Sequence, residues 1–355
     1  MKGLILAGGF GTRLRPLTYT SAKQLIPIAN KPIIFYGIES LVNCGIKEVG
    51  IVVGDTAEEV KKTVGNGERW NNKIEYIYQS APLGLAHAIK ISADFLKDEP
   101  FIMYLGDNIL KEGVSDFVKK FGEVKPDALI LLTEVNNPQE FGVVVVDEKG
   151  TVKKLIEKPK EPPSNLALVG IYLFNKNIFT AIEHIKPSWR NELEITDAIQ
   201  WLLDNKFNII SDKVKGWWKD TGKPEDIIEA NLLILEGIES FNQGVLIDTT
   251  VNGRVRIGQG TKIEKSVIRG PALIGNDAHI AKAFIGPFTS IGDNVVIQNS
   301  EVECSVIMEG AKIQNLNKRI DRSIIGKNVI INQTDISPRS HRFYLGDQSF
   351  VEIVE

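Results

Sequence analysis

The sequence has few of the residues that mark disulfide-bonded, zinc-binding or nucleic-acid-binding proteins. Its 355 residues include only two cysteines, Cys44 and Cys304, and four histidines, and the formal net charge is −3. Two distant cysteines without a CxxC motif argue against a disulfide framework and against a thiolate zinc site. The charges are nearly balanced and interspersed. The sequence therefore lacks the concentration of positive charge that is typical of nucleic-acid-binding proteins. We therefore expect no nucleic-acid partner.

Long apolar segments are absent as well. The longest runs, such as ALILL at 128–132, are far shorter than the roughly 20 residues that a membrane-spanning helix needs. The run LILA at 4–7 is too short for the apolar region of a signal peptide. We therefore expect no membrane contact and a cytoplasmic location. The length favours two domains.

Short β-rich runs alternate with helical patterns from Lys2 to about Glu236. Nearly continuous apolar runs are typical of parallel strands buried on both faces, and strand–helix alternation predicts a doubly wound α/β domain. The expected strands are residues 3–7, 48–53, 74–79, 101–107 and 128–135, and the expected helices are 32–45, 57–64, 84–96 and 114–124. Gly45 is expected to end the first of these helices.

Helical periodicity stops after about Phe241, where isoleucines recur at a spacing near six. The pattern runs through Ile257, Ile263, Ile274, Ile280, Ile285, Ile291 and Ile297, resumes at Ile325, and often places glycine next, as in IGQG and IGDN. A six-residue period indicates a parallel β-helix, here similar to the left-handed hexapeptide-repeat kind. We predict one domain at 1–240 and the β-helix at 241–355, with the non-repeating end as a possible cap.

The stretch LILAGGFGTRLRPLT at 4–18 follows the first expected strand and suggests an anion-binding loop. Its glycines let backbone N–H groups approach an anion closely. It is not a Walker A loop, because no lysine follows Gly11, and it is not a Rossmann fingerprint, because Leu14 stands where the third glycine belongs. A tight turn with exposed arginines is the competing interpretation.

Further polar residues stand near the ends of the expected strands. Lys23 lies between the first strand and the first helix, Gln79 and Gly84 follow the third strand, and Asp107 ends the fourth. Asp220 lies in GWWKDTG. Since open α/β sheets bind ligands at the carboxyl ends of their strands, this set favours Mg²⁺-dependent phosphoryl chemistry.

The motifs GGFGTRLRPLT, KQLIPIANKPII, QSAPLGLA, LGDN, EFGVV, EKP, ELEITD and WWKDTG occur together and in order. With them the chain resembles the sugar nucleotidylyltransferases, specifically the glucose-1-phosphate thymidylyltransferase group. It resembles the long form of that group, which carries a C-terminal hexapeptide-repeat domain. The resemblance implies a Rossmann-like nucleotidyltransferase domain with a mixed, mostly parallel sheet, followed by the left-handed β-helix. It implies Mg²⁺ as cofactor and dTTP and glucose 1-phosphate as substrates.

The resemblance also implies residue roles. Arg13, Lys23, Asp107 and Asp220 would be catalytic, and the two aspartates would hold Mg²⁺. The nucleotide would be bound by Gly8, Gly9, Gly11, Thr12, Gln79 and Gly84, with Gln79 on the pyrimidine edge. The sugar phosphate would be lined by Gly142, Glu157, Lys158, Val169 and Trp218, with Lys158 on the phosphate. Phe141 stands where many short-form members have tyrosine, which leaves sugar specificity open.

Alternatives remain at this stage. A UTP-using or broad-specificity enzyme is one, and a non-catalytic regulatory homologue is another. A bifunctional enzyme with acetyltransferase activity in the β-helix is a third, with His279 as its candidate base. We read the four histidines as structural, expect Thr196 to cap a helix, assign Glu192 and Asp197 no catalytic role, and leave Arg15 open between phosphate and solvent. A homo-oligomer is expected, since solenoid flanks offer flat surfaces for subunit contacts.

Overall fold

The structure is a computed structural model that describes residues 1–335 and 341–353. The chain forms two compact units, which are described one at a time. The first contains residues 1–10, 21–25 and 33–220, and the second contains 11–20, 26–32 and the described residues from 221 onward. Helix α8 (Pro224–Leu235) thus groups with the repeats, and the boundary expected at residue 240 stays a prediction.

The first unit is built on one mixed sheet, in the order β10-β9-β11-β6-β1-β4-β5, with β8 and β12 joined beside β11. Strands β6, β1, β4 and β5 are mutually parallel, whereas β11 runs antiparallel to β6, β8 and β9. The strands are β1 (Lys2–Ala7), β4 (Glu48–Val53), β5 (Lys73–Tyr78), β6 (Phe101–Leu105), β8 (Ala128–Glu134), β9 (Gly142–Val146), β10 (Val152–Glu157), β11 (Leu166–Phe174) and β12 (Ile209–Lys213). The mixed, mostly parallel sheet predicted from the sequence is confirmed.

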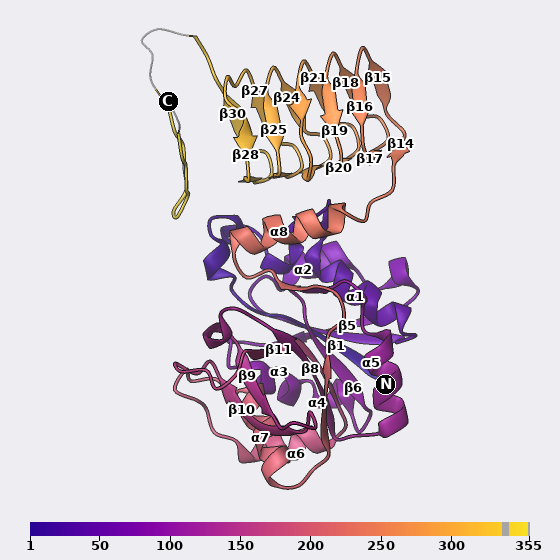
Figure 1. Cartoon of the computed structure of the whole chain (residues 1–355), viewed down its shortest axis with the longest axis vertical. Helices are drawn as coiled ribbons and strands as arrows, with labels where there is room; N and C mark the ends of the chain where they lie inside the picture. Colours follow the sequence, from indigo (N-terminus) through magenta and orange to yellow (C-terminus); the bar gives the residue numbers. More distant parts are fainter. Residues whose placement is uncertain (336–340, 354–355) are drawn as a thin grey trace. The chain divides into compact units, whose positions relative to one another are not determined.

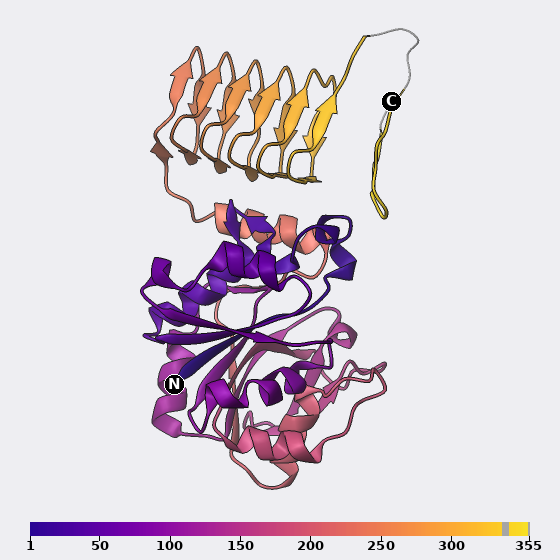
Figure 2. The same cartoon turned by 180° about the vertical axis from the view of Figure 1, so that it is seen from behind.

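Helices cover both faces of this sheet (Figures 1 and 2). Alternate residues of β1 enter two cores: Leu4 and Leu6 pack with α3, α4, α6 and α7, whereas Ile5 and Ala7 pack with α1, α2 and α5. This burial on both faces explains why β1 is apolar along its whole length. The helices are α1 (Ile33–Asn43), α2 (Ala57–Val64), α3 (Leu85–Ile91), α4 (Ala93–Leu96), α5 (Ser115–Val124), α6 (Asn177–His184) and α7 (Ile195–Asp204).

Most of the expected boundaries are correct to within one or two residues, and Gly45 does end α1. Its φ is +80°, and its N–H donates to the carbonyl of Val42 at 2.8 Å. The expected helix at 84–96 is instead two helices, α3 and α4. Ser92 lies between them, and its hydroxyl donates to the carbonyl of Ala88 at 2.7 Å, a local bond that competes with continuous helical pairing.

Short elements complete both units. Strands β7 (Asn108–Leu110) and β13 (Trp218–Asp220) form a separate antiparallel pair in the first unit. The second unit contains the pair β2 (Pro27–Ile28) and β3 (Lys31–Pro32). Single 3₁₀ turns are η1 (Thr12–Leu14), η2 (Leu17–Tyr19), η3 (Lys23–Leu25), η4 (Glu68–Trp70) and η5 (Pro138–Glu140).

The repeats of the second unit form the predicted left-handed β-helix, seen as stacked coils in Figure 2. Every strand pairs in parallel with the strand three places later, so that three sheets run along the stack. Ile257, Ile274, Ile291, Ile307 and Ile325 are register partners in successive coils of one sheet. These partners lie one coil apart, and each coil has three sides, one in each sheet. The spacing near six arises because each side contributes a residue to the interior.

The strands of the three sheets are all short. The first sheet contains β14 (Phe241–Asn242), β17 (Val255–Ile257), β20 (Ala272–Ile274), β23 (Thr289–Ile291), β26 (Val306–Ile307) and β29 (Ile324–Ile325). The second contains β15 (Val245–Ile247), β18 (Lys262–Glu264), β21 (His279–Ala281), β24 (Val296–Gln298), β27 (Lys312–Gln314) and β30 (Ile330–Asn332). The third contains β16 (Thr250–Asn252), β19 (Val267–Arg269), β22 (Phe284–Ile285), β25 (Glu301–Glu303) and β28 (Ile320–Asp321).

The non-repeating end shows no sign of acting as the expected cap within its described part. Phe343, Tyr344, Leu345 and Phe350 all expose more than half of their surface. No strand or helix is assigned among residues 341–353. Residues 336–340 of the same stretch lie outside the described residues.

Asn231 joins α8 to the β-helix within the second unit. Its side chain is buried, and its Oδ1 accepts from the Ala29 N–H at 2.9 Å and from the Ser290 hydroxyl at 2.5 Å. Its Nδ2 donates to the carbonyl of Phe288 at 3.1 Å. One amide therefore satisfies three polar groups, one at Ala29 and two in the coil that contains Phe288 and Ser290.

Replacing this amide should destabilise the second unit. Asn231→Ala leaves buried donors and an acceptor without their partner, and we expect it to lower the free energy of unfolding by about 1–3 kcal/mol. Denaturant unfolding followed by circular dichroism measures the effect. Gln243→Ala, at an exposed position of the same unit, is the control and should change it by less than about 0.5 kcal/mol. Equal stability of the two variants would show that the amide does not hold α8 to the coils.

Candidate active site

The carboxyl ends of the parallel strands bring several expected residues to one edge of the sheet. Gly8 directly follows β1, Gln79 follows β5, and Asp107 lies two residues beyond β6. A Cβ on Gly8 would lie 3.3 Å from Oε1 of Gln79 and 3.5 Å from the backbone nitrogen of Gly54. The glycine thus leaves room for the Gln79 amide and for a close ligand.

Lys23 and Asp107 form an ion pair at this edge. The Lys23 ammonium donates to Oδ2 of Asp107, and Oδ1 of the same carboxylate accepts from Nδ2 of Asn108 at 3.1 Å. Burial alone would raise the pKa of Asp107, but the Lys23 charge and these hydrogen bonds hold it below its ordinary value. A Cβ on Gly9 would lie 3.8 Å from Nζ of Lys23. Gly9, Lys23 and Asp107 therefore form one charged cluster.

Asp220 lies at the end of β13, the strand that pairs with β7. Its backbone is the register partner of Asn108, the residue that follows Asp107. In the same pair, the indole N–H of Trp218 donates to Oδ1 of Asn108 at 2.6 Å. Of the two expected metal ligands, Asp220 ends β13, and Asp107 lies in the turn just before β7, its partner strand.

The donor set fits Mg²⁺. Magnesium prefers oxygen ligands and is usually bound by one or two protein carboxylates together with substrate phosphates. Asp107 and Asp220 supply two carboxylates, and Lys23 supplies a positive charge for the substrate phosphates. No cluster of three or more histidine, cysteine, aspartate or glutamate side chains suited to a metal occurs in residues 1–335 and 341–353.

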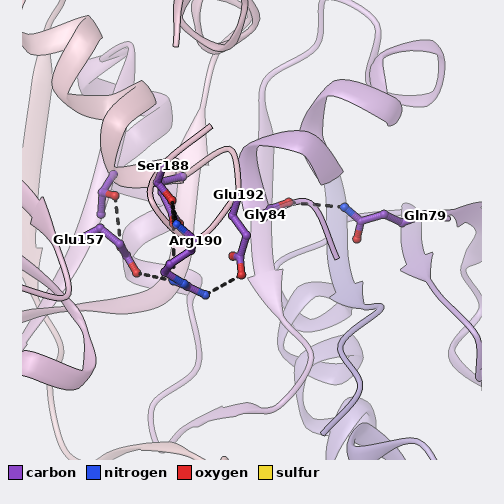
Figure 3. Close-up of polar contacts among 8 residues, drawn as sticks. Gln79, Gly84, Glu157, Ser188, Arg190 and Glu192 are labelled. Atoms are coloured by element: carbon purple, nitrogen blue, oxygen red, sulfur yellow. Dashed lines mark hydrogen bonds and ion pairs between the residues drawn. The ribbon is translucent and has the colours of Figure 1, made fainter. Parts of the chain in front are cut away.

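A second polar cluster surrounds Glu157 at the end of β10. Its Oε2 accepts from the Thr196 hydroxyl at 3.2 Å, and its Oε1 lies 3.3 Å from Nη1 of Arg190. Arg190 also donates to Glu192 at 2.8 Å, so that its guanidinium lies between the two carboxylates (Figure 3). Burial and the neighbouring Glu194 raise the pKa of Glu157. Arg190 also lies 3.6 Å from Oε1 of Glu194, so its guanidinium offsets the charge of three neighbouring carboxylates.

Gly142 is required by the packing beside Glu157, its register partner in the β9–β10 ladder. A Cβ there would come within 2.8 Å of Cγ2 of Thr196 and 3.2 Å of Oε2 of Glu157. Lys158 follows with an exposed side chain, and its N–H donates to the carbonyl of Phe141 at 3.1 Å. The rings of Phe141 and Trp218 meet edge to face at 5.6 Å, so the aromatic pair connects the two polar clusters.

Two expectations need revision. Thr196 does not cap a helix: α7 begins at Ile195, and the buried Thr196 hydroxyl instead donates to Glu157. The side chain of Val169 is fully buried in the core. The pairing of β11 with β8 shifts register between Leu168 and Tyr172, an irregularity of the kind that frees backbone groups. The role expected of Val169 beside the sugar phosphate stays a prediction, which its backbone rather than its side chain would have to fulfil.

Gly84 lies at the start of α3, where no other residue would fit. Its φ is +103°, and a Cβ would lie 2.3 Å from the carbonyl oxygen of Leu193. Its own carbonyl faces Nε2 of Gln79 at 3.5 Å (Figure 3). The glycine therefore serves the packing of α3 in addition to any contact with a base.

Gly11, Thr12 and Arg13 belong to the second unit. Gly11 has a φ of +62°, and its carbonyl accepts from the Thr18 hydroxyl at 2.8 Å. A Cβ on Gly222 would lie 2.7 Å from Nη2 of Arg13, so the guanidinium packs directly on the backbone of that turn. Arg15, left open above, lies over the ring of Tyr19 at 4.8 Å.

His279, the candidate base for acetyl transfer, lies on β21 of the β-helix. Its Nε2 is 3.4 Å from Oε2 of Glu264, and about two fifths of its side chain is exposed. This is a surface pair on one sheet of the solenoid. No observation on the described residues favours acetyl transfer over the chemistry of the first unit.

Comparison with known proteins identifies the family. The nucleotidyl transferase family matches residues 2–237. This chain belongs to the nucleotidyl transferase family. It is a nucleotidyltransferase of the long form, in which a β-helix follows the catalytic domain.

Two relatives match this chain along nearly its whole length. The chain is 50% identical to a glucose-1-phosphate thymidylyltransferase of Streptomyces antibioticus, over 99% of each protein. It is 48% identical to a glucose-1-phosphate thymidylyltransferase of Streptomyces griseus, again over 99% of each. Among solved structures, a putative glucose-1-phosphate thymidylyltransferase from Bacillus anthracis, in complex with a sucrose, is similar with a TM-score of 0.63 and 34% identity. That match covers 68% of this chain and 98% of the other.

The helices of the first unit and α8 are all short. None of the helices assigned in residues 1–335 and 341–353 has the length and apolar character needed to cross a bilayer.

Proposed function

We propose that this enzyme transfers a thymidylyl group from dTTP to glucose 1-phosphate, giving dTDP-glucose and pyrophosphate. The observation that carries the proposal is the connected set of polar groups in the first unit. It runs from Gln79 and Gly8 through the Lys23–Asp107 pair to Asn108 and Trp218. Phe141 then joins it to Glu157 and Arg190. One end is suited to a base, the middle to phosphates and the other end to a sugar phosphate. The full-length relatives named for this reaction support the same assignment.

The reaction is an in-line displacement. A phosphate oxygen of glucose 1-phosphate attacks the α-phosphorus of dTTP, a new P–O bond forms, and the bond to the departing pyrophosphate breaks. The nucleophile is already an anion, so no general base is required. Catalysis then consists of positioning two anions and offsetting their repulsion.

Each charged residue has a defined part in this scheme. Lys23 lies beside Asp107 and neutralises the reacting phosphates, Lys158 holds the sugar phosphate, and Arg190 holds the Glu157 carboxylate in place. We assign Arg13 to the departing pyrophosphate from its sequence motif alone, together with Gly11 and Thr12 at the nucleotide phosphates. Asp107 and Asp220 would hold Mg²⁺, which when bound supplies positive charge to the triphosphate.

The choice of base rests on Gln79. Its Oε1 can accept a hydrogen bond from the N3–H of thymine or uracil, whereas N3 of cytosine carries no hydrogen to donate. One methyl group separates thymine from uracil and is worth about 1–3 kcal/mol in an apolar pocket. Strong preference for dTTP with residual use of UTP is therefore expected.

A panel of nucleoside triphosphates with glucose 1-phosphate and Mg²⁺ tests the proposal, with pyrophosphate release as the readout. We expect dTTP to exceed UTP by about 10–200-fold in kcat/KM, with CTP and GTP lower still. Equal turnover of CTP or GTP would contradict the assignment. Preference for UTP over dTTP would favour the uridylyl alternative.

Glu157 should make sugar binding pH-dependent. Because burial raises its pKa, the carboxylate becomes protonated at a higher pH than an ordinary glutamate as the pH falls. The protonated form no longer accepts hydrogen bonds with both oxygens, so KM for glucose 1-phosphate should increase as the pH falls toward the raised pKa of Glu157. Glu157→Gln should have a raised KM that lacks this contribution. Since the substrate phosphate also titrates, the comparison is between the two profiles; identical slopes would contradict the role.

We further propose a homo-oligomer, because the flat sheets of the β-helix suit contacts between subunits. Analytical ultracentrifugation of the full chain tests this, and a monomer at micromolar concentration would refute it.

A further inference from the structure

His87 touches the residue assigned to read the base. It lies on α3, and its Nδ1 is 2.9 Å from Nε2 of Gln79. Gln79 is buried, and His87 is half-buried. A histidine first read as structural therefore contacts the specificity group itself.

The surroundings of Gln79 define which way its amide points. Nε2 faces the carbonyl of Gly84 at 3.5 Å, and a carbonyl oxygen can only accept. Oε1 lies on the opposite side, next to Gly8. Figure 3 shows the amide nitrogen directed toward Gly84 and the amide oxygen turned away from it.

This orientation requires a particular form of His87. Because the amide Nε2 is a donor, the ring Nδ1 must accept, and the imidazole must be neutral with its proton on Nε2. Burial, and then the charge of Lys90, lower the pKa of His87, which favours the neutral ring. A neutral ring with its proton on Nε2 therefore fits the amide orientation that the Gly84 carbonyl sets.

We propose that His87 is a positioning residue for base selection: by accepting from Nε2 of Gln79, it keeps Oε1 available to the nucleotide. An oxygen acceptor matches the N3–H of thymine or uracil. The flipped amide would instead present a donor, which matches the unprotonated N3 of cytosine. The inference rests on the proposed function, because it assumes that Gln79 reads the base.

The test is base discrimination, expressed as the ratio of kcat/KM for dTTP to that for dCTP. His87→Leu removes the acceptor, and His87→Asn restores one through its side-chain carbonyl. Loss of one such bond corresponds to roughly 3–10-fold, so the ratio should fall by about that factor in His87→Leu and recover in His87→Asn. KM for dTTP should carry the change, with kcat nearly constant. His184→Leu, on the exposed face of α6, is the control.

A double-mutant cycle separates positioning from general packing. Gln79→Ala should itself abolish most of the discrimination, and adding His87→Leu should then change the ratio no further. If Gln79→Ala lowers the ratio but His87→Leu leaves it unchanged, the role of His87 is refuted and the proposed function stands. Additive losses would show that His87 acts through packing, which also refutes it. If the native enzyme does not prefer dTTP, or Gln79→Ala keeps the preference, both proposals fall together.

Discussion

Lys23→Ala should lower turnover by about 10²–10³-fold, the effect of removing other single donors that stabilise a developing charge. Lys23 is the cation of the central cluster: its ammonium pairs with Asp107 and lies beside Gly9, next to the expected phosphates. Two strongly anionic reactants must meet there, and without the ammonium their repulsion is offset less well. Steady-state pyrophosphate release at saturating substrates measures the loss in kcat.

The structural role of Lys23 requires a second variant. Asp107 is buried, and removing its cation could destabilise the first unit. Lys23→Gln keeps a donor for the carboxylate while removing the charge, so it should fold like the native enzyme and still lose most of its activity. Lys62→Ala, at an exposed position of α2, is the matched control. Turnover within about threefold of native in a folded Lys23→Gln variant would contradict the assignment.

Asp107→Asn should lower kcat by a similar factor of about 10²–10³. The amide keeps the size of the carboxylate but removes the charge that holds Lys23 and would hold Mg²⁺. The variant should also need a higher Mg²⁺ concentration for half-maximal activity, because a neutral amide is a weaker ligand for a hard cation than a carboxylate. Titration of Mg²⁺ at fixed substrate measures both effects.

Asp55→Asn provides the control for Asp107. Asp55 lies just beyond β4 at the same edge of the sheet, but it is exposed. It should keep the native Mg²⁺ dependence. Asp107→Asn with native kcat and an unchanged Mg²⁺ midpoint would show that this carboxylate does not serve the metal.

The parallel half of the sheet could be predicted because each of its strands is a continuous apolar run. The boundaries of β4 (48–53) and α2 (57–64) are correct to the residue. The β-helix was predictable for a related reason, since Ile274 and Ile291 must fill the same interior position in successive coils. In both cases the sequence shows a pattern because buried positions recur at a fixed interval along the chain.

The antiparallel strands β9, β10 and β11 were not placed individually. Their pairing depends on long-range register, such as Gly142 with Glu157 and Ile171 with Tyr104, which no local pattern specifies. Nor did any pattern predict the grouping of α8 with the repeats. That arrangement depends on the three hydrogen bonds of Asn231, all of which reach residues more than 50 positions away.

The candidate site likewise contains residues that local motifs predict and residues that only long-range contacts reveal. Lys23 and Asp107 stand in strong motifs, and the structure does bring them together. Arg190 and His87 lie outside the residues assigned from the motifs, and their roles become visible only through contacts with Glu157 and Gln79. A guanidinium flanked by acidic residues at 190–194 was the available signal for Arg190. For Val169, only burial shows that its side chain belongs to the core.

The most direct test of the central claim is the fate of labelled dTTP. The native enzyme is incubated with glucose 1-phosphate, Mg²⁺ and dTTP labelled with ³²P at either the α- or the γ-position, and the products are separated by chromatography. Attack at the α-phosphorus predicts that the α-label enters dTDP-glucose and that the γ-label leaves in pyrophosphate. A γ-label in free phosphate or on the sugar, or no labelled sugar nucleotide, would contradict the account.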